Sequence, residues 1–522
     1  MRGRTIGAKA SGAGLLALAA VATLAFGAGH TSDSSGGSGQ DPGGTVTPPP
    51  DYVLEKRIPA GVDVFDLNLR ETRRYSASKR LKVLGHSYLK GDWLTPIARR
   101  EGLGAGLNGV RVHEGIAYLA GYDTPPTMFG VLIADVRNPR RIRPLSFIPC
   151  NPGARCAYLR LNAERKILVV GHDQSASNPR QPPAGQPVRA GFGFYDVSDP
   201  RRPRQLGFLQ TAANGKTHGF DIDGRHVYGC AWAPPLKPIE TGNANQELKI
   251  IDYADPRHPR EVGNIHVPGQ RVGEEVPPQD QVNPDGSLQQ VSCHEVVLHD
   301  ERAYVAWRDA GMVIVDVEDP SQPRFVSRLD YVPPFHGGAL GAAHTSAPVV
   351  TGSGRPRLLV QTDEIFDCPP GFGRLIDISD LDYPRILSSF RIPAISDNFD
   401  FDSGRFRCED GFQTVHLPWF DFRSPSLVYV TWYDQGLRVW NISNPFLPRQ
   451  IGYYISPRYA PPQRAFPPTA PPAVEGEWRQ TREVYQDRTT GRLYLTDGNG
   501  GGLTVLKWTG RVPDRPPIPG AR

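Results

Sequence analysis

The stretch AYVAWRDAGMVIVDVEDPSQPRFVSRLDY, residues 303–331, decides the fold of this chain. Three runs rich in β-branched and aromatic residues alternate with short turn-forming segments, a pattern that predicts three consecutive strands. The middle run ends in Asp316-Val317-Glu318-Asp319-Pro320. An aspartate at the start of such a phrase can accept hydrogen bonds from the backbone N–H groups of a turn, and proline suits turns and strand edges. The phrase is therefore expected to be structural rather than catalytic.

The same phrase recurs along the chain at a nearly constant spacing. Its copies begin 61, 56, 64, 61 and 64 residues apart, at Asp135, Asp196, Asp252, Asp316, Asp377 and Asn441. Leu381 replaces the proline of the fifth copy, and Asn441 replaces the first aspartate of the sixth. A repeat of this length with four short strands in each unit is typical of a β-propeller, in which each blade is a four-stranded sheet.

The repeat predicts an all-β fold, a seven-bladed β-propeller of four-stranded antiparallel blades over residues 78–510. Inner strands are expected to begin near residues 108, 157, 218, 293, 344, 415 and 482. The last unit contains only three strand-like runs, whereas SKRLKVLGHSYL at 78–89 resembles the fourth run of other units. We expect this N-terminal run to be the outer strand of the last blade, which would close the ring and leave no exposed sheet edge.

The repeated cores GMVIVDVEDP, LKIIDYADP and GFGFYDVSDP resemble the LVIVD repeat of exported bacterial proteins. Six clear copies cover about residues 130–457, and a degenerate seventh follows them. The resemblance implies a β-propeller. It implies no particular activity, because the family has no single reaction that could be carried over to this chain.

The N-terminal residues have the pattern of a secretory signal peptide. Arg2, Arg4 and Lys9 precede an apolar run at 13–27 and small residues suited to cleavage, so residues 1–29 are interpreted as a signal peptide. Residues 30–77 are interpreted as a low-complexity tether and lead-in, and residues 511–522 as a proline-rich tail. We therefore expect an exported protein, periplasmic, at the cell surface or secreted, with no transmembrane segment in its mature chain.

The charge balance argues against nucleic acid as a partner. The 522 residues include 59 Lys and Arg against 54 Asp and Glu, and the net charge of +5 falls to +2 without the three positive charges of the signal peptide. So small an excess is not the footprint of a nucleic-acid-binding protein. The sequence contains no P-loop, Rossmann, nucleophile-elbow or H-E-x-x-H motif. We expect a monomer whose partner is an unknown protein or small-molecule ligand.

The six cysteines form an even set, as expected of an exported chain with disulfides. Positions in neighbouring parts of the repeat favour three pairs: Cys150 with Cys156, Cys230 with Cys293, and Cys368 with Cys408. Sequence alone allows fifteen pairings of six cysteines. The C-x5-C spacing of the first pair is not that of zinc ligands, so the cysteines are interpreted as disulfides rather than metal thiolates.

The candidate site lies where the inner strands begin. The long connections of the repeat all fall on that face of the predicted propeller, and functional residues are common on loops held by a rigid scaffold. Four of the thirteen histidines occupy equivalent positions at this end of consecutive inner strands: His218, His294, His344 and His416. We expect them to converge as an arc at the mouth of the central channel.

Further polar residues are expected at the same mouth. Glu364 joins the histidines as a candidate metal ligand, whereas Glu295 is expected on the opposite side of its strand by alternation. Candidates for ligand binding are Asn108, His172, Asp309 and Asp434. Clusters of histidine and carboxylate bind Zn, Cu, Fe, Ni or Mn, so a divalent transition metal is the predicted cofactor. The alternative is a set of polar residues that line a wet channel and bond to one another.

Two functions are compatible with these patterns, and no catalytic residue is assigned from the sequence. The first is a ligand- or protein-binding scaffold that acts through the loop-rich face. The alternative is a metal-dependent enzyme, an oxidoreductase or a hydrolase, with the histidine cluster at the channel mouth. The family resemblance favours the scaffold and the arc favours the enzyme. In fold and site placement the arc is similar to that of the selenium-binding/methanethiol oxidase propellers, which use channel histidines for copper.

Overall fold

The structure is a computed structural model that describes residues 76–100, 102–122, 127–213, 215–232, 246–281, 289–330, 343–351, 354–365, 370–392, 399–400, 405–406, 414–456 and 480–513. The chain divides into two compact units, Met1–Val46 and Thr47–Arg522, and every described residue belongs to the second unit. The predicted signal peptide, the tether up to residue 75 and the end of the tail from residue 514 lie outside the described residues.

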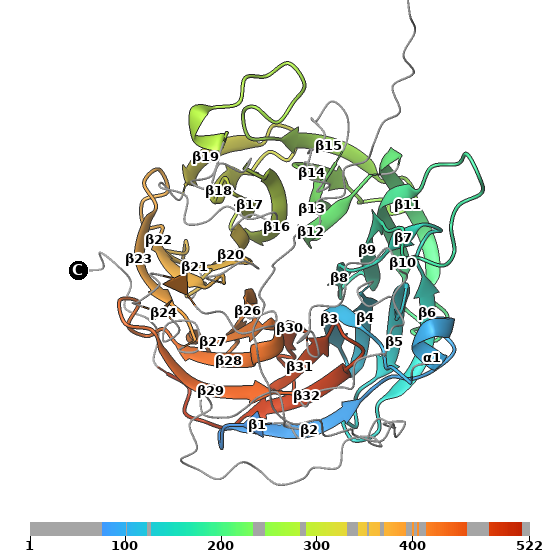
Figure 1. Ribbon diagram of the computed structural model, residues 1–522. Helices are drawn as coiled ribbons and strands as arrows, with labels where there is room; N and C mark the ends of the chain where they lie inside the picture. Colours follow the sequence, from blue (N-terminus) through green and yellow to red (C-terminus); the bar gives the residue numbers. More distant parts are fainter. Residues whose placement is uncertain are drawn as a thin grey trace, which may run out of the picture. The chain divides into compact units, whose positions relative to one another are not determined.

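Antiparallel strands make up nearly all of the described fold (Figure 1). The exceptions are the short helix α1 (Pro96–Arg100) and the 3₁₀ turns η1 (Pro278–Asp280) and η2 (Tyr433–Gln435). β-branched and aromatic residues fit a pleated, half-buried surface, which is why runs such as Met312–Asp316 form strands. Within the described ranges, no helix is long and apolar enough to cross a membrane.

The first units of the repeat each form one antiparallel sheet whose strands pair in chain order. The first sheet contains β3 (Leu107–His113), β4 (Ile116–Gly121), β5 (Gly130–Asp135) and β6 (Arg143–Pro149). The second contains β8 (Leu159–Asn162), β9 (Ile167–Gln174), β10 (Arg189–Asp196) and β11 (Arg204–Ala213), with β7 (Ala154–Arg155) added to β9. The third contains β12 (Thr217–Ile222), β13 (His226–Ala231), β14 (Glu247–Asp252) and β15 (Arg260–Ile265).

The next units follow the same order. One contains β16 (Val291–His299), β17 (Arg302–Arg308), β18 (Met312–Asp316) and β19 (Arg324–Leu329). It is joined by one residue pair, Arg308 with Ala343, to β20 (Ala343–Pro348), β21 (Leu358–Asp363), β22 (Gly373–Asp377) and β23 (Arg385–Phe390). A further sheet contains β26 (Val415–Asp421), β27 (Ser424–Trp432), β28 (Gly436–Asn441) and β29 (Arg449–Ile455). The two-residue strands β24 (Phe399–Asp400) and β25 (Arg405–Phe406) pair with each other.

The N-terminal and C-terminal parts of the described chain share a sheet. β30 (Thr481–Gln486), β31 (Arg492–Asp497) and β32 (Gly502–Trp508) form a four-stranded sheet with β2 (Leu81–Ser87). β2 pairs with β32, so that Leu81 lies opposite Trp508. The still earlier β1 (Ser76–Ala77) pairs with β29, and strand pairing therefore begins two residues before the expected boundary at 78.

The Asp-x-x-Asp-Pro phrase forms two successive turns after the third strand of a unit. Asp316 Oδ1 accepts the backbone N–H of Glu318 at 3.0 Å, and Asp319 Oδ1 accepts that of Ser321 at 2.9 Å. Asp316 Oδ2 also accepts a hydrogen bond from Arg324 at 2.9 Å. The same turn bond and the same arginine eight residues later recur at three further copies: Asp196, Asp252 and Asp377. The structural role predicted for the phrase is confirmed.

Each of these turns also packs on the outer strand of the preceding sheet. Ser146 of β6 donates a hydrogen bond to the carbonyl oxygen of Pro200 at 2.6 Å, and Ser388 of β23 donates one to that of Pro445 at 2.6 Å. Where glycine takes the place of serine, an added Cβ would lie within 2.2 Å of the proline oxygen in three pairs: Gly207 with Pro256, Gly263 with Pro320, and Gly85 with Pro139. Only small residues fit this contact between sheets.

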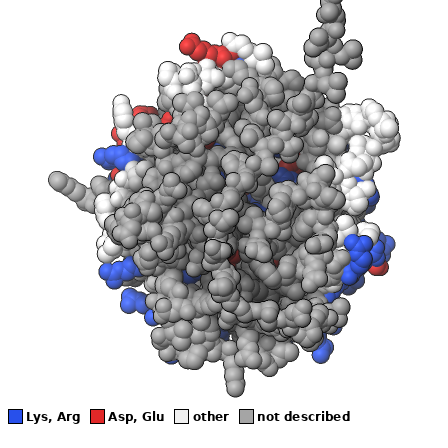
Figure 2. All heavy atoms as spheres, in the orientation of Figure 1, with Lys and Arg blue, Asp and Glu red and all other residues white. Residues whose placement is uncertain are grey.

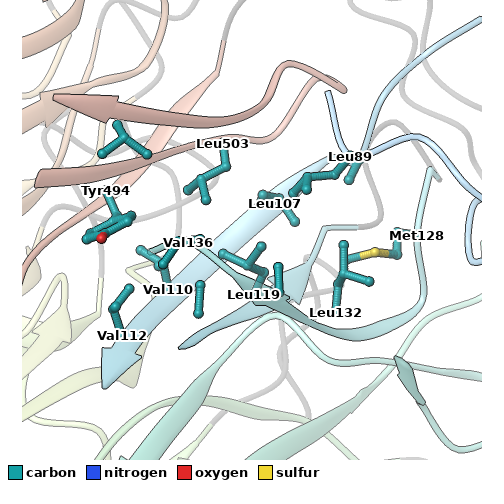
Figure 3. Packing of buried hydrophobic residues seen from close by; sticks show 14 of the residues in the cluster. Leu89, Leu107, Val110, Val112, Leu119, Met128, Leu132, Val136, Tyr494 and Leu503 are labelled. Carbon is teal, nitrogen blue, oxygen red and sulfur yellow. The ribbon is translucent and has the colours of Figure 1, made fainter. Parts of the chain in front are cut away.

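Hydrophobic clusters between neighbouring sheets form the core. In the cluster of Figure 3, Leu107 and Val110 of β3 pack with Tyr494 of β31 and Leu503 of β32. None of these four side chains is more than 1% exposed. Complete burial of a large apolar side chain contributes about 1.5–3 kcal/mol. The sheet that holds β2 and the first sheet therefore share a core.

Two of the three predicted disulfides fall within the described residues, and both are confirmed as pairs. The Cα atoms of Cys150 and Cys156 are 5.9 Å apart, and those of Cys230 and Cys293 are 5.3 Å apart. Among the residues that the structure describes, no cysteine is free. The third predicted pair, Cys368 with Cys408, lies outside the described residues.

Charged side chains of the described residues lie around the rim of the face shown in Figure 2, where lysine and arginine alternate with acidic residues. Several surface arginines pair with the aspartate that begins a turn, as Arg204 does with Asp196 and Arg324 with Asp316. These arginines therefore belong to the turn chemistry of the repeat.

Candidate functional site

The site is built on irregular positions near the start of four consecutive first strands. The strand register shifts in β12 between Thr217 and Phe220, and corresponding shifts occur near the start of β16, β20 and β26. Each shifted segment carries one of the predicted histidines: His218, His294, His344 and His416. A bulge re-aims the side chain that it carries and interrupts the alternation of the pleat. The bulges thus allow four equivalent side chains to turn toward one another.

The four imidazoles lie side by side in chain order. Ring centroids are 4.1 Å apart for His218 and His294, 4.4 Å for His294 and His344, and 4.3 Å for His344 and His416. The Nε2 atoms of His218 and His294 are 2.5 Å apart. His218 is half-buried, whereas the other three are at most 2% exposed. The structure therefore brings all four histidines together.

Hydrogen bonds at Nδ1 determine which ring nitrogen is available to a ligand. Nδ1 of His294 lies 3.3 Å from the carbonyl oxygen of His344, and Nδ1 of His416 lies 2.6 Å from that of Arg482. Because a carbonyl oxygen only accepts hydrogen bonds, both Nδ1 atoms carry the proton, and Nε2 of each neutral ring keeps its lone pair. A histidine that binds a metal through one nitrogen typically donates from the other to a carbonyl or carboxylate.

Glu364, which directly follows β21, faces two of these rings. Its Oε2 lies 3.7 Å from Nε2 of His344, and its Oε1 lies 3.7 Å from Nε2 of His416. Arg308 donates a hydrogen bond to Oε2 at 3.1 Å, and the hydroxyl of Tyr433 donates one to Oε1. Ligand atoms of His294, His344 and Glu364 lie within 4.8 Å of one another.

Burial keeps the rings neutral, while nearby positive groups keep the carboxylate ionised. Burial lowers the pKa of His416 to about 4 and lowers the pKa values of the other three rings well below 6.5: His218, His294 and His344. Burial alone would raise the pKa of Glu364, but His344, Arg308 and His416 lower it to about 2. Neutral imidazole and ionised carboxylate are the forms in which these side chains bind a metal.

Of the other predicted residues, Asn108 lies with the histidines. It lines the same cavity, and its side-chain amide donates to the carbonyl oxygen of Ala157 at 2.9 Å. Glu295 lines a different cavity of about 470 Å³, where it accepts a hydrogen bond from Arg160 at 3.0 Å. Strand alternation thus separates Glu295 from its neighbour His294, as expected.

His172, Asp309 and Asp434 do not line the histidine cavity. Nε2 of His172 lies 3.2 Å from the hydroxyl of Tyr195 on the adjacent strand. Asp309 accepts the backbone N–H of Gln290 at 2.7 Å. Asp434 accepts a hydrogen bond from the side chain of its neighbour, Gln435, at 3.3 Å. All three stand near the ends of second strands, but they bond within their own sheets and loops instead of across the channel.

The cavity also contains side chains that sequence reasoning missed. They are tyrosines and cations: Tyr122, Tyr158, Tyr433, Arg155, Lys216, Arg308 and Arg482. The hydroxyl of Tyr158 lies 3.1 Å from Nε2 of His218. Arg482 could have been found, because it is the second residue of β30 as His416 is the second residue of β26. The tyrosines carry no such positional signal.

Together these side chains enclose about 240 Å³. Sites for drug-sized ligands typically span about 300–1,000 Å³. The cavity therefore has room for a small molecule beside the histidines and Glu364.

The sequence match and the sheets define the class of protein. The family model of the LVIVD repeat matches residues 292–330, which include nearly all of β16 and the whole of β17, β18 and β19. The chain is an LVIVD-repeat β-propeller. No curated protein matches it in sequence.

Several solved structures are similar in fold at low identity. A chain of the mitotic checkpoint complex is 10% identical, with 88% of this chain and 100% of that chain covered and a TM-score of 0.45. Sqt1 from Saccharomyces cerevisiae is 7% identical, with 78% and 97% covered and a TM-score of 0.43. A hypothetical selenium-binding protein from Sulfolobus tokodaii is 12% identical, with 54% and 65% covered and a TM-score of 0.37.

Proposed function

We propose that the propeller is a closed ring of seven blades in which β2 is the outer strand of the last blade. The contact between a small outer-strand residue and the proline carbonyl of the next turn supports this proposal. It links Ser146 to Pro200 and, in the same way, Gly85 of β2 to Pro139 in the first sheet. A ring of this kind brings the first strands together at one axis, where the histidines stand.

We propose further that the channel mouth binds a divalent transition metal and that the protein is a metal-dependent enzyme. Two imidazoles and one carboxylate, His294, His344 and Glu364, would form the centre of the ligand set. His416 adjoins the same carboxylate on its other side. Nitrogen and carboxylate ligands suit Zn, Cu, Fe, Mn and Ni. A metal with open positions can polarise a substrate or activate water, and this accommodates a hydrolase or an oxidoreductase.

One relationship carries the proposal. Nε2 of His416 and Oε1 of Glu364 are 3.7 Å apart, and at neutral pH both are hydrogen-bond acceptors. Two acceptors repel unless a proton or a cation lies between them. A pKa of about 4 for His416 and about 2 for Glu364 disfavours the proton. A transition metal bonded to each atom at about 2.0–2.2 Å would span the separation.

A channel of histidines bonded only to one another explains the same residues less completely. His218 can donate from Nε2 to the bare Nε2 of His294, which satisfies that pair without a metal. No such donor faces His416, because Glu364 is ionised. The metal is therefore assigned to the part of the arc around Glu364.

Elemental analysis of the full chain, purified without chelators, tests the proposal. We expect close to one transition-metal ion per chain, which chelation removes and added Zn²⁺ or Cu²⁺ restores. Glu364→Gln preserves shape but removes the negative charge, and His294→Ala removes an imidazole. Each should lower metal affinity about 10- to 100-fold or more.

His258→Ala is the matched control, because its exposed ring pairs only with Asp255 of its own turn. This variant should bind the metal as the wild type does. Wild-type protein that remains metal-free after exposure to Zn²⁺, Cu²⁺, Fe²⁺ and Mn²⁺ would refute the metal centre.

The scaffold function and export remain predictions. The long connections at 232–246, 332–343 and 458–480, on which a binding face would depend, lie largely outside the described residues. The two disulfides are compatible with an oxidising compartment.

A further inference from the structure

Arg482 carries a buried positive charge without an ion pair among the described residues. Its side chain donates from one terminal nitrogen to the hydroxyl of Tyr433 at 2.7 Å and from the other to Oε1 of Gln480 at 2.7 Å. The residue is 6% exposed. Its guanidinium lies over the ring of Tyr122 at 3.8 Å, a contact that offsets part of the lost hydration.

Other buried arginines near the channel do have carboxylate partners. Arg308 pairs with Glu364 at 3.1 Å, and Arg160 pairs with Glu295 at 3.0 Å. Arg111 occupies a position close to that of Arg482 in the fold and pairs with Glu483 at 2.6 Å. An ion buried without a partner is costly, and proteins generally pair such charges. Arg482 is therefore the exception that a bound anion would explain.

The lining of the cavity also has an excess of positive charge. It contains four cationic side chains and two carboxylates: Arg155, Lys216, Arg308 and Arg482, with Asp173 and Glu364. The histidines add no charge, because burial keeps them neutral. A cleft lined mainly by one sign of charge concentrates ligands of the opposite sign. A bound metal would increase the excess.

We propose that the substrate of this site is a small organic oxyanion, a carboxylate or a phosphate, held by Arg482 beside the metal. The inference rests on the proposed function, since it names the substrate class of the same cavity. A guanidinium presents a planar fork of donors that matches both oxyanions. Arg482 is tied to the histidine arc, because its carbonyl oxygen accepts the Nδ1 proton of His416. The rings of Tyr122 and Tyr433 would contact the organic part.

Three probes of similar size test the inference: benzoate, phenyl phosphate and benzylammonium. Each is titrated calorimetrically into the full chain, first metal-free and then metal-loaded. We expect the anions to bind and benzylammonium not to bind, and the stronger anion identifies the oxyanion class. Arg482→Gln should weaken anion binding about 10- to 100-fold, the loss expected for hydrogen bonds to a charged group. Metal content should stay at the wild-type level.

Arg482→Lys keeps the charge but loses the fork, so it should bind the anion with intermediate affinity and tests the proposal even if the glutamine variant folds poorly. Arg488→Gln is the control, because Arg488 is exposed and lines the other cavity. Equal binding of benzylammonium, or unchanged anion affinity in both Arg482 variants, would overturn the inference. Anion binding through Arg482 in a protein that takes up no metal would refute the metal centre alone, and metal uptake without anion binding would refute the anion site alone.

Discussion

Gly85 lies so close to Pro139 that an added Cβ would be 1.8 Å from the carbonyl oxygen of the proline. Gly85 belongs to β2, which pairs with the last strand of the chain, whereas Pro139 belongs to the turn that follows β5. The equivalent contact joins Gly207 to Pro256 in the next sheets. β2 therefore makes the contact of an outer strand.

Replacement of Gly85 by valine should destabilise the whole domain, because the obstructing atom is a backbone oxygen that cannot turn aside. Overpacking of this kind costs about 1–3 kcal/mol. Gly224→Val is the matched control, since no atom lies within 4 Å of a Cβ added at Gly224. Urea denaturation measures both variants. Equal stability of the two would contradict the closure of the ring by β2.

A second prediction compares two serines at equivalent positions. Ser146 lies opposite Ile133 and donates to the carbonyl oxygen of Pro200, whereas Ser327 lies opposite Ile314 and its buried hydroxyl has no hydrogen-bond partner among the described residues. The following turn has Leu381 at the position of the proline, which accounts for the difference.

Ser146→Ala should therefore lower the free energy of unfolding by about 1 kcal/mol, the net value of a hydrogen bond. Ser327→Ala removes a buried polar group that has no partner, so it should leave stability unchanged or raise it. Thermal unfolding of the two variants measures the difference. A larger loss for Ser327→Ala than for Ser146→Ala would show that the turn contact has no energetic value.

The fold was predictable because turn chemistry is local and visible in the sequence. Asp316 and its equivalents mark each turn, and His344 could be located because it holds a fixed place in the repeat. The position of Tyr433 was not predictable, since it comes from a 3₁₀ turn outside any period. Strand ends alone suggest that His172 and Asp434 face the mouth, but side-chain direction depends on bulges and pairing that the sequence does not reveal.

Acid should destabilise the protein through His86. Burial lowers the pKa of His86 in the folded protein from 6.5 to about 3. The unfolded chain therefore binds a proton that the folded protein does not bind between these two values, and stability falls as the pH drops below 6.5. At pH 5 the loss is about 2 kcal/mol, at about 1.4 kcal/mol for each pH unit below 6.5.

His86→Gln should reduce this loss, because glutamine does not titrate and can still bond to Thr504, which now lies 2.9 Å from Nδ1 of the ring. Urea denaturation at pH 7.5 and pH 5 measures the change for wild type, His86→Gln and the exposed-site control His258→Gln. If His86→Gln lost as much stability on acidification as the wild type, His86 would not be the group that titrates.

The two described disulfides should differ in their contribution to stability. Cys230 and Cys293 are 63 residues apart in the chain, whereas Cys150 and Cys156 are 6 residues apart. In the chain-entropy account, closing the longer loop stabilises by about 4 kcal/mol and closing the shorter loop by about 2 kcal/mol. Replacement of both cysteines by serine should therefore cost more for the first pair, as measured by urea denaturation.

The longer bridge should also support the metal centre. Cys293 directly precedes His294, and its partner Cys230 lies on β13 of the neighbouring sheet. The bridge restrains the strand segment that positions His294, whereas no predicted metal ligand adjoins Cys150 or Cys156 in the chain. Loss of the first bridge should weaken metal uptake in the elemental analysis, and loss of the second should leave it unchanged. Equal metal content in both serine variants would mean that the bulge holds His294 without help from the disulfide.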